Sequence, residues 1–319
     1  MTKILSIVGS TASGKSALAL ELAKRLGGEI ISCDSMQVYR RMDIGTAKPT
    51  KEEQMAVKHH LIDVVEPTES FSSADYVTLA TAAVDDCQKR GKLPIICGGT
   101  GLYLDALLRG SDPSPNTVDE TVRAELLSFA EVNGNEALWR RLLEIDPVSA
   151  EATHPNNVKR VARAIEIYLV SGITKTELDR RSRAVEDRYD ACVIGLRYPD
   201  RRVLYDRINR RVDIMIAEGL ADETRALMDE GVFEKNTTAA QAIGYKEILP
   251  YCRGEVSLDE AAETLRTATR RYAKRQITWF SAKDHVKWID VDDSGKKTFE
   301  EIVNNAEKLF KNFSKYDKI

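Results

Sequence analysis

Apolar and polar positions in the first third of the chain alternate between two kinds of segment. Short, almost wholly apolar runs are typical of strands buried on both faces, and longer amphipathic segments that end at glycine are typical of helices. The pattern predicts strands over residues 4–8, 30–33, 60–65 and 93–97, and helices over 16–26 and 76–90. Strands separated by helices in this way predict an α/β fold, a parallel sheet with helices on both faces.

The pattern changes at residues 110–116, GSDPSPN, whose prolines, glycine and serines are typical of a domain boundary. From Thr117 to about Arg188 no segment predicts a strand. Thr117-x-x-Glu120 predicts a capping box at the start of one helix, and further amphipathic helices are expected over residues 135–145 and 157–170. We expect an all-helical insertion.

Strand character then returns. The pattern predicts strands over residues 190–196 and 285–290, helices over 201–231 and 257–284, and a closing amphipathic helix from about residue 298. Ser257-x-x-Glu260 predicts a capping box at the start of the second helix. We therefore expect an α/β core from residues 1–111 and 190–319, with a helical insertion over residues 112–189.

Composition limits the function classes. The chain has 319 residues, of which 43% are hydrophobic and 30% charged, and its formal net charge is −3. This charge argues against a general nucleic-acid coat protein but permits a local basic patch. We expect no signal peptide and no membrane-spanning helix. The five cysteines contain no C-x-x-C pair, and with no zinc spacing among the histidines we expect reduced core thiols in a cytoplasmic protein.

Residues 9–16, GSTASGKS, fit the phosphate-binding motif G-x-x-x-x-G-K-[ST], between a predicted strand and a predicted helix. This motif is typical of nucleotide-binding and ATP-binding proteins, and it predicts a P-loop NTPase-like fold. Loop N–H groups and the following helix N-terminus would cradle a di- or triphosphate. The predicted diphosphate-binding residues are Gly9, Ser10, Thr11, Ala12, Ser13, Gly14, Lys15 and Ser16. Lys15 would pair with phosphate oxygens, and the Ser16 hydroxyl would coordinate Mg²⁺.

Asp34 follows the next predicted strand and permits two interpretations. It could hold magnesium, as such aspartates usually do in P-loop enzymes, or it could act as a general base aimed at the acceptor of a transfer. The chain has neither the N-K-x-D guanine signature nor an apolar run that ends in Asp-Glu, a feature typical of ATPase motors. The motif alone therefore favours a transferase over a motor.

Eight stretches in order resemble the tRNA dimethylallyltransferases of the bacterial type, the isopentenyl transferases that prenylate an adenine beside the anticodon. The first three are GSTASGKS, DSMQVYRRMDIGTAKP at 34–49 and GGTGLY at 98–103. The others are HPNNVKRVARAIE (154–166), SGITKTEL (171–178), RVDIMIAEGL (211–220), AIGYKE (242–247) and RQITWF (275–280). Ser10 departs from the family's usual proline, and the zinc finger of some eukaryotic members has no counterpart.

The resemblance implies that the exocyclic amine of adenosine 37 in tRNA attacks dimethylallyl diphosphate and releases diphosphate. An allylic diphosphate ionises readily, so the main task is to stabilise the leaving group, which suits a phosphate loop with Mg²⁺. By the same resemblance Asp34 matches the general base, while Thr100 and Arg211 match residues that contact the diphosphate. From the residues alone, Thr100 could serve only a strand-to-helix turn, and Arg211 could lie on a solvated helix face.

A base that reacts must leave its stack, so a pocket for the adenine is required. Ser35, Met36 and Gln37 match the family's adenine-pocket segment, although Met36 could equally pack in a core. Basic residues of the insertion suit phosphate contacts with an anticodon stem, although such charge runs are usually solvated surface. The remaining predicted tRNA-binding residues are Lys159, Arg160, Val161, Ala162, Arg163, Gly244, Tyr245 and Lys246.

Two alternatives stay open. A P-loop small-molecule kinase would use Asp34 to activate a hydroxyl and would turn over ATP. A non-catalytic RNA-binding NTPase switch would hydrolyse nucleotide slowly and leave its RNA unmodified. On the preferred interpretation, the partners are the tRNA anticodon stem-loop and dimethylallyl diphosphate, and the protein is a monomer that needs no membrane.

Overall fold

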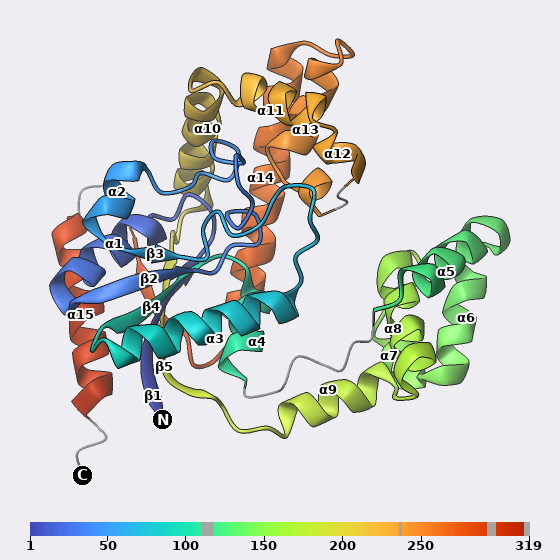
Figure 1. Ribbon diagram of the computed structural model, residues 1–319, viewed down its shortest axis with the longest axis horizontal. Helices are drawn as coiled ribbons and strands as arrows, with labels where there is room; N and C mark the ends of the chain where they lie inside the picture. The colour runs from blue at the N-terminus through green and yellow to red at the C-terminus, as the bar shows by residue number, and fades with distance from the viewer. Residues whose placement is uncertain (110–117, 236–237, 292–297, 316–319) are drawn as a thin grey trace. The chain divides into compact units, whose positions relative to one another are not determined.

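The computed structural model describes residues 1–109, 118–235, 238–291 and 298–315. Contacts divide the chain into two compact units, one formed by Met1–Leu108 with Tyr189–Ile319 and one formed by Arg109–Arg188 (Figure 1). Each unit is described by itself. The boundary predicted at residues 110–116 lies outside the described residues.

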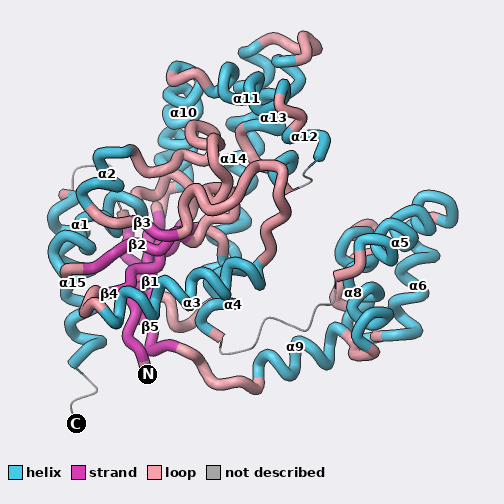
Figure 2. Tube along the Cα trace, in the orientation of Figure 1, coloured by secondary structure: helices cyan, strands magenta, loops and turns pink. Residues whose placement is uncertain are grey.

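A six-stranded sheet forms the centre of the first unit, and Figure 2 shows its strands grouped together. The strand order is β3-β2-β4-β1-β5-β6, and every pairing is parallel. The strands are β1 (Thr2–Gly9), β2 (Gly28–Ser32), β3 (His59–His60), β4 (Leu93–Gly98), β5 (Tyr189–Arg197) and β6 (Lys287–Asp290). The structure confirms the predicted parallel α/β sheet.

Helices cover both faces of this sheet because alternate residues of its strands point to opposite sides. On β1, Ile4 and Val8 join one hydrophobic cluster, whereas Leu5 and Ile7 join the other. Helices α3 (Ser73–Lys89) and α4 (Gly101–Leu108) pack in the first cluster, and α1 (Lys15–Leu26) and α15 (Phe299–Lys315) pack in the second. Two helices, α10 (Arg201–Ala217) and α14 (Leu258–Ser281), contribute to both clusters.

The remaining helices of this unit are α2 (Lys51–Ala56), α11 (Leu220–Asp229), α12 (Val232–Lys235), the 3₁₀ helix η1 (Ala239–Gln241) and α13 (Tyr245–Cys252). The long helix predicted over residues 201–231 is wrong, because Gly219 at φ 99° separates α10 from α11. The strand predicted over residues 60–65 shrinks to two residues, since Leu61 and Asp63 both have positive φ and turn the chain. Ser257 forms the predicted capping box with Glu260.

The second unit contains α5 (Glu120–Asn133), α6 (Asn135–Ile145), α7 (Pro147–Glu151), α8 (Val158–Ser171) and α9 (Lys175–Arg183). Its own core includes the fully buried Leu138, Leu142 and Val161. Thr117, the predicted cap, lies outside the described residues, and Asp119 caps α5 instead by accepting hydrogen bonds from the N–H groups of Thr121 and Val122. Within the described residues of the chain, no helix is long and apolar enough to cross a membrane.

A buried carboxylate fixes α3 to the amino end of β2. Glu29 accepts two hydrogen bonds from the guanidinium of Arg90, and His60 Nε2 lies 2.7 Å from Glu29 Oε2. The Arg90 guanidinium, and to a lesser extent His60, lowers the pKa of Glu29 to about 2 against the opposing effect of burial. Ligand atoms of Glu29, His60 and Cys87 lie within 4.8 Å of one another, but both Glu29 oxygens are already held by Arg90.

We predict that Glu29→Gln lowers the free energy of unfolding by about 2 kcal/mol at pH 7, because it removes the charge that holds Arg90. The folded-state pKa lies below the ordinary value of 4.5, so the stabilisation is fully present above pH 4.5 and is lost as pH falls toward about 2. Urea unfolding at several pH values measures the difference between wild type and variant.

That difference should therefore shrink between pH 5 and pH 3. Glu300→Gln, which removes an exposed partner of Arg25, is the control and should cost less than about 1 kcal/mol. A Glu29→Gln difference that stays constant over this pH range would contradict the assignment.

Candidate active site

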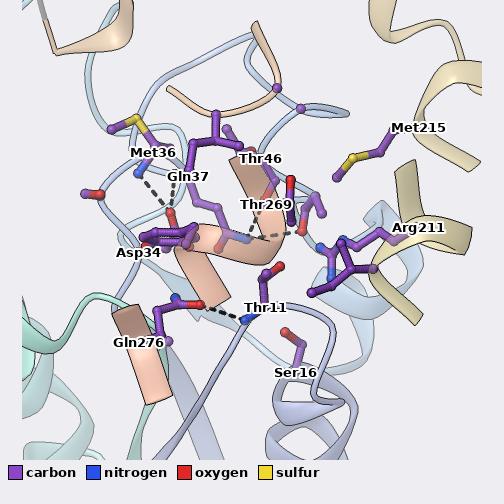
Figure 3. Close-up of a pocket in the computed structure, with 18 of the residues that line it drawn as sticks. Thr11, Ser16, Asp34, Met36, Gln37, Thr46, Arg211, Met215, Thr269 and Gln276 are labelled. Atoms are coloured by element: carbon purple, nitrogen blue, oxygen red, sulfur yellow. Dashed lines mark hydrogen bonds between the residues drawn. The ribbon is translucent and has the colours of Figure 1, made fainter. Parts of the chain in front are cut away.

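The carboxyl ends of β1, β2 and β4 open into a cavity of about 510 Å³ in the first unit, as expected for a parallel sheet. The loops after β1 and β2 and the end of β4 form one side of the cavity, and α10 and α14 form the other (Figure 3). The volume suits a small ligand with several polar groups. Within the described part of the chain, this cavity gathers most residues of the first unit that the sequence predicts to be functional.

The loop between β1 and α1 has the backbone shape of a phosphate cradle. Ala12 and Gly14 both adopt positive φ, at 60° and 90°, and the loop then enters α1 at Lys15. Thr11, Lys15 and Ser16 line the cavity, and the Lys15 amine donates a 3.3 Å hydrogen bond to the Ser10 carbonyl. Gly9–Ser16 thus places loop N–H groups, a cation and a hydroxyl at a helix N-terminus.

Two partly buried cations face one carboxylate across the cavity. Burial lowers the pKa of Lys15 and of Arg211, and the charge of Asp34 opposes this effect on both. Arg211 extends from α10 toward the cavity (Figure 3), so the solvated-face interpretation of its position is wrong. An anion bound between these two cations would stabilise their charged forms.

Asp34 is held by the turn that follows it. Its Oδ1 accepts hydrogen bonds from the N–H groups of Met36, at 2.9 Å, and Gln37, at 3.4 Å (Figure 3). Among the described residues, its second oxygen, Oδ2, has no hydrogen-bond partner. The turn therefore fixes the carboxylate and leaves one oxygen available to a ligand.

Thr100 supports this turn from the loop after β4. Its hydroxyl accepts a 3.2 Å hydrogen bond from the Ser35 N–H, and its own N–H donates to the Cys33 carbonyl at 3.2 Å. Tyr272 of α14 lies near its side chain. Thr100 is not among the residues that line the cavity. Its hydrogen bonds place it beside the turn that carries Asp34.

The stretch after Asp34 lines the cavity, and hydrogen bonds within residues 32–47 hold it in place. Ser35, Met36 and Gln37 all line the cavity, and Met36 also packs against the first hydrophobic cluster. The Gln37 amide donates to the carbonyls of Thr46 and Ala47 and accepts from the Ser32 hydroxyl. Both amide protons of Gln37 are thus engaged, and one lone pair of its Oε1 remains for a base edge.

The basic residues of this stretch serve the fold. Arg40 and Arg41 both pair with Glu66. The Lys48 side chain is 4% exposed and pairs with Asp43 and Asp63. These contacts account for all three of the basic side chains in residues 34–49.

Two of residues 244–246 line the cavity, and the third is buried in the fold. Gly244, at φ 111°, and Lys246 line the cavity. Tyr245 is fully buried, and its hydroxyl donates a 2.6 Å hydrogen bond to Glu223, so its side chain supports the fold, while an RNA contact at this residue stays a prediction. Glu223 also accepts the N–H groups of residues 43–45 and thereby holds the loop after Asp34.

The predicted tRNA-binding residues of the second unit lie on α8. Lys159 and Arg160 are exposed, whereas Val161 and Ala162 are fully buried in the core of that unit. The helical period turns these two side chains inward, and tRNA contact at this segment of α8 stays a prediction. Arg163 is partly exposed and lies 3.0 Å from the buried Glu166.

Sequence reasoning missed the wall that α10 and α14 contribute. Its apolar members are Ile208, Val212, Met215, Leu265 and Ala268, and its polar members include Thr269, Tyr272, Arg275 and Gln276. The segments RVDIMIAEGL and RQITWF include part of this wall, but they suggested no role for Gln276. The oxygen donors present, the Ser16 hydroxyl and the Asp34 carboxylate, are of the kind that Mg²⁺ prefers.

The family model described as IPP transferase matches residues 37–283. A tRNA dimethylallyltransferase from Acetivibrio thermocellus is 48% identical, over 99% of this chain and 97% of its own length. The crystal structure of the full-length tRNA isopentenylpyrophosphate transferase from Bacillus halodurans is similar with a TM-score of 0.72 and 46% identity, and the match covers 100% of both chains.

A eukaryotic dimethylallyltransferase whose structures capture it acting on tRNA is also similar, with a TM-score of 0.82 and 29% identity. That match covers 98% of this chain and 80% of the eukaryotic chain. The family model matches most of this chain, and the relatives are nearly 50% identical to it over almost their whole length. This chain therefore belongs to the IPP transferase family, the family of the tRNA dimethylallyltransferases.

Proposed function

We propose that this enzyme transfers a dimethylallyl group from dimethylallyl diphosphate to the N6 amine of adenosine 37 in tRNA. One observation carries the proposal: a single cavity sets the cations of a phosphate loop against the carboxylate of Asp34. The cationic side suits a leaving diphosphate, and the carboxylate suits an acceptor that must lose a proton. The family relationship supports tRNA as the acceptor.

The leaving group would bind at the loop Gly9–Ser16. Its N–H groups, the α1 N-terminus, Lys15 and Arg211 supply positive potential in a cavity that excludes much of the water, where such interactions are strong. As the allylic C–O bond breaks, its electron pair goes to the diphosphate. The cationic groups stabilise the charge that develops there, and the allylic cation is delocalised without help from the protein.

Mg²⁺ fits the oxygen donors of this cavity. The exposed Ser16 hydroxyl would hold it together with phosphate oxygens of the substrate, and the Asp34 carboxylate stands as the alternative protein ligand. Bound there, the ion would neutralise charge on the diphosphate.

The acceptor amine would be placed against Asp34. An adenine amine is a weak nucleophile because its lone pair is delocalised into the ring. Nitrogen forms the new C–N bond while Asp34 Oδ2, the oxygen without a protein partner, takes the N–H proton. The hydrogen bonds from Met36 and Gln37 to Oδ1 hold the carboxylate in one orientation.

The wall beside the loop favours prenyl transfer over the kinase alternative. Ile208, Val212 and Met215 of α10 face Leu265 and Ala268 of α14 around the cavity. Branched aliphatic surface suits a five-carbon chain, whereas the ribose and base of ATP would need polar partners.

The exposed Lys159 and Arg160 of α8 would contact phosphates of the anticodon stem, and this contact would weaken with added salt. Gly244 and Lys246 would lie beside the flipped adenosine. We further propose that the enzyme acts in the cytoplasm as a monomer.

The proposal predicts a specific product. Anticodon stem-loop RNA incubated with the enzyme, dimethylallyl diphosphate and Mg²⁺, without nucleoside triphosphate, should gain the mass of one isoprene unit on adenosine 37. Mass spectrometry of the digested RNA measures this gain. The matched control RNA carries inosine at that position, lacks the acceptor amine, and should stay unmodified. An unmodified adenosine together with ATP-dependent phosphorylation would establish the kinase alternative instead.

Asp34→Asn keeps the size of the side chain but removes the base. We predict a fall of about 10²–10⁴-fold in the single-turnover rate constant, with affinity for a non-reactive thio analogue of dimethylallyl diphosphate changed less than about threefold. Asp43→Asn, an exposed carboxylate on the same loop, serves as the control and should retain activity. A parallel loss of Mn²⁺ binding and analogue binding in Asp34→Asn would assign the residue to the metal instead.

A further inference from the structure

Gln276 is a buried amide that joins two loops of the cavity. The residue is 5% exposed and lies on α14. Its Oε1 accepts a 2.8 Å hydrogen bond from the Thr11 N–H of the phosphate loop (Figure 3). Its Nε2 donates a 3.0 Å hydrogen bond to the Gly99 carbonyl in the loop after β4. A backbone N–H can only donate and a carbonyl can only accept, so these partners fix the orientation of the amide.

The backbone of the loop after β4 packs closely against this side chain and its helix. A Cβ at Gly99 would lie 2.0 Å from Gln276 Nε2, and a Cβ at Gly101 would lie 2.2 Å from the Trp279 ring. Both distances are far below any real carbon contact, so the loop after β4 reaches α14 only because these positions are glycine. The helix and the loop are therefore in direct contact at the amide.

The Oε1 atom of the amide contacts the loop that would bind the leaving group. Thr11 belongs to the loop that would cradle the diphosphate, and its N–H is used by Gln276. While this hydrogen bond is made, the Thr11 N–H is held toward α14 and not toward an anion. Gln276 thereby determines which N–H groups of Gly9–Ser16 stay available to the ligand.

The Nε2 atom of the amide contacts the loop that supports the proposed base, Asp34. Gly99 precedes Thr100, whose hydroxyl accepts the Ser35 N–H next to Asp34. Tyr272, four residues before Gln276 on the same helix, lies near Thr100. Two side chains on one face of α14 thus lie beside the segment that supports the turn of the carboxylate.

We propose that Gln276 is a positioning residue for the transfer, whose amide sets the separation between the phosphate loop and the turn that holds Asp34. This inference rests on the proposed function, since the separation matters only if leaving group and base act on one pair of reactants. Small errors in such a separation are costly because the reacting atoms must lie about 3–3.5 Å apart.

Gln276→Glu tests the proposal through pH. An ionised glutamate still accepts the Thr11 N–H but faces the Gly99 carbonyl with a second acceptor. A protonated glutamate restores the donor and reproduces both hydrogen bonds of the amide. Burial and the adjacent carbonyl disfavour the ionised form, whereas the Thr11 N–H and the cations of the cavity favour it. We expect burial to prevail and to raise the pKa of the introduced carboxyl above that of an ordinary glutamate.

We predict that the single-turnover rate constant of Gln276→Glu, at saturating substrates, is about 10–100-fold below wild type at pH 8.5. The ratio of variant to wild type should rise at least several-fold by pH 6. Expressing the result as a ratio removes the pH dependence that both proteins share through the acceptor and its base. A ratio that is constant over this range, or equal to one throughout, overturns the proposal.

Gln276→Met is the matched control, because it fills a similar volume and makes neither hydrogen bond. The ratio of its single-turnover rate constant to that of wild type should be low and independent of pH. If the methionine variant does not fold, the pH dependence of Gln276→Glu alone decides the test. An inactive wild type would refute the proposed function. If the wild type is active but the ratio of the Gln276→Glu rate constant to the wild-type rate constant does not change with pH, only the role of Gln276 is refuted.

Discussion

The whole site depends on how closely β4 approaches β2 at their carboxyl ends. The Cys33 N–H donates to the Cys97 carbonyl at 2.8 Å, and a Cβ on Gly98 would lie 2.0 Å from the Cys33 carbonyl oxygen. No side chain fits there, so a glycine is required. This contact carries the loop after β4 directly behind Asp34, and Thr100 then fixes the adjoining turn through the Ser35 N–H.

The phosphate loop supplies only half of the chemistry. Lys15 of the loop and Arg211 of α10 are partly withdrawn from water, which lowers the pKa of both and prepares them for an anion. The other half comes from Asp34, which stands across the cavity with one oxygen held and one available. A loop best known for nucleotide triphosphates can therefore serve an allylic diphosphate, because the same positive potential stabilises either leaving group.

The sequence predicted the sheet, the loop and Asp34 because each depends on local pattern: apolar runs, glycine spacing and a residue that directly follows a strand. It could not predict contacts made across long separations. The role of Gln276 depends on Thr11 and Gly99, which lie 265 and 177 residues away. The burial of Tyr245 depends on its partner Glu223, which no short motif connects to it. The break at Gly219 lay within reach of sequence reasoning, since glycine is a poor helix former.

The account's central claim is that the phosphate loop holds a leaving diphosphate while Asp34 deprotonates an adenine amine in the same cavity. The most direct measurement is the amount of diphosphate released per adenosine modified when the enzyme, dimethylallyl diphosphate, Mg²⁺ and anticodon stem-loop RNA are mixed without nucleotide. The account predicts equal amounts of the two products, and no release when the RNA lacks the acceptor amine. Diphosphate release without modified adenosine, or modification only when ATP is added, would contradict it.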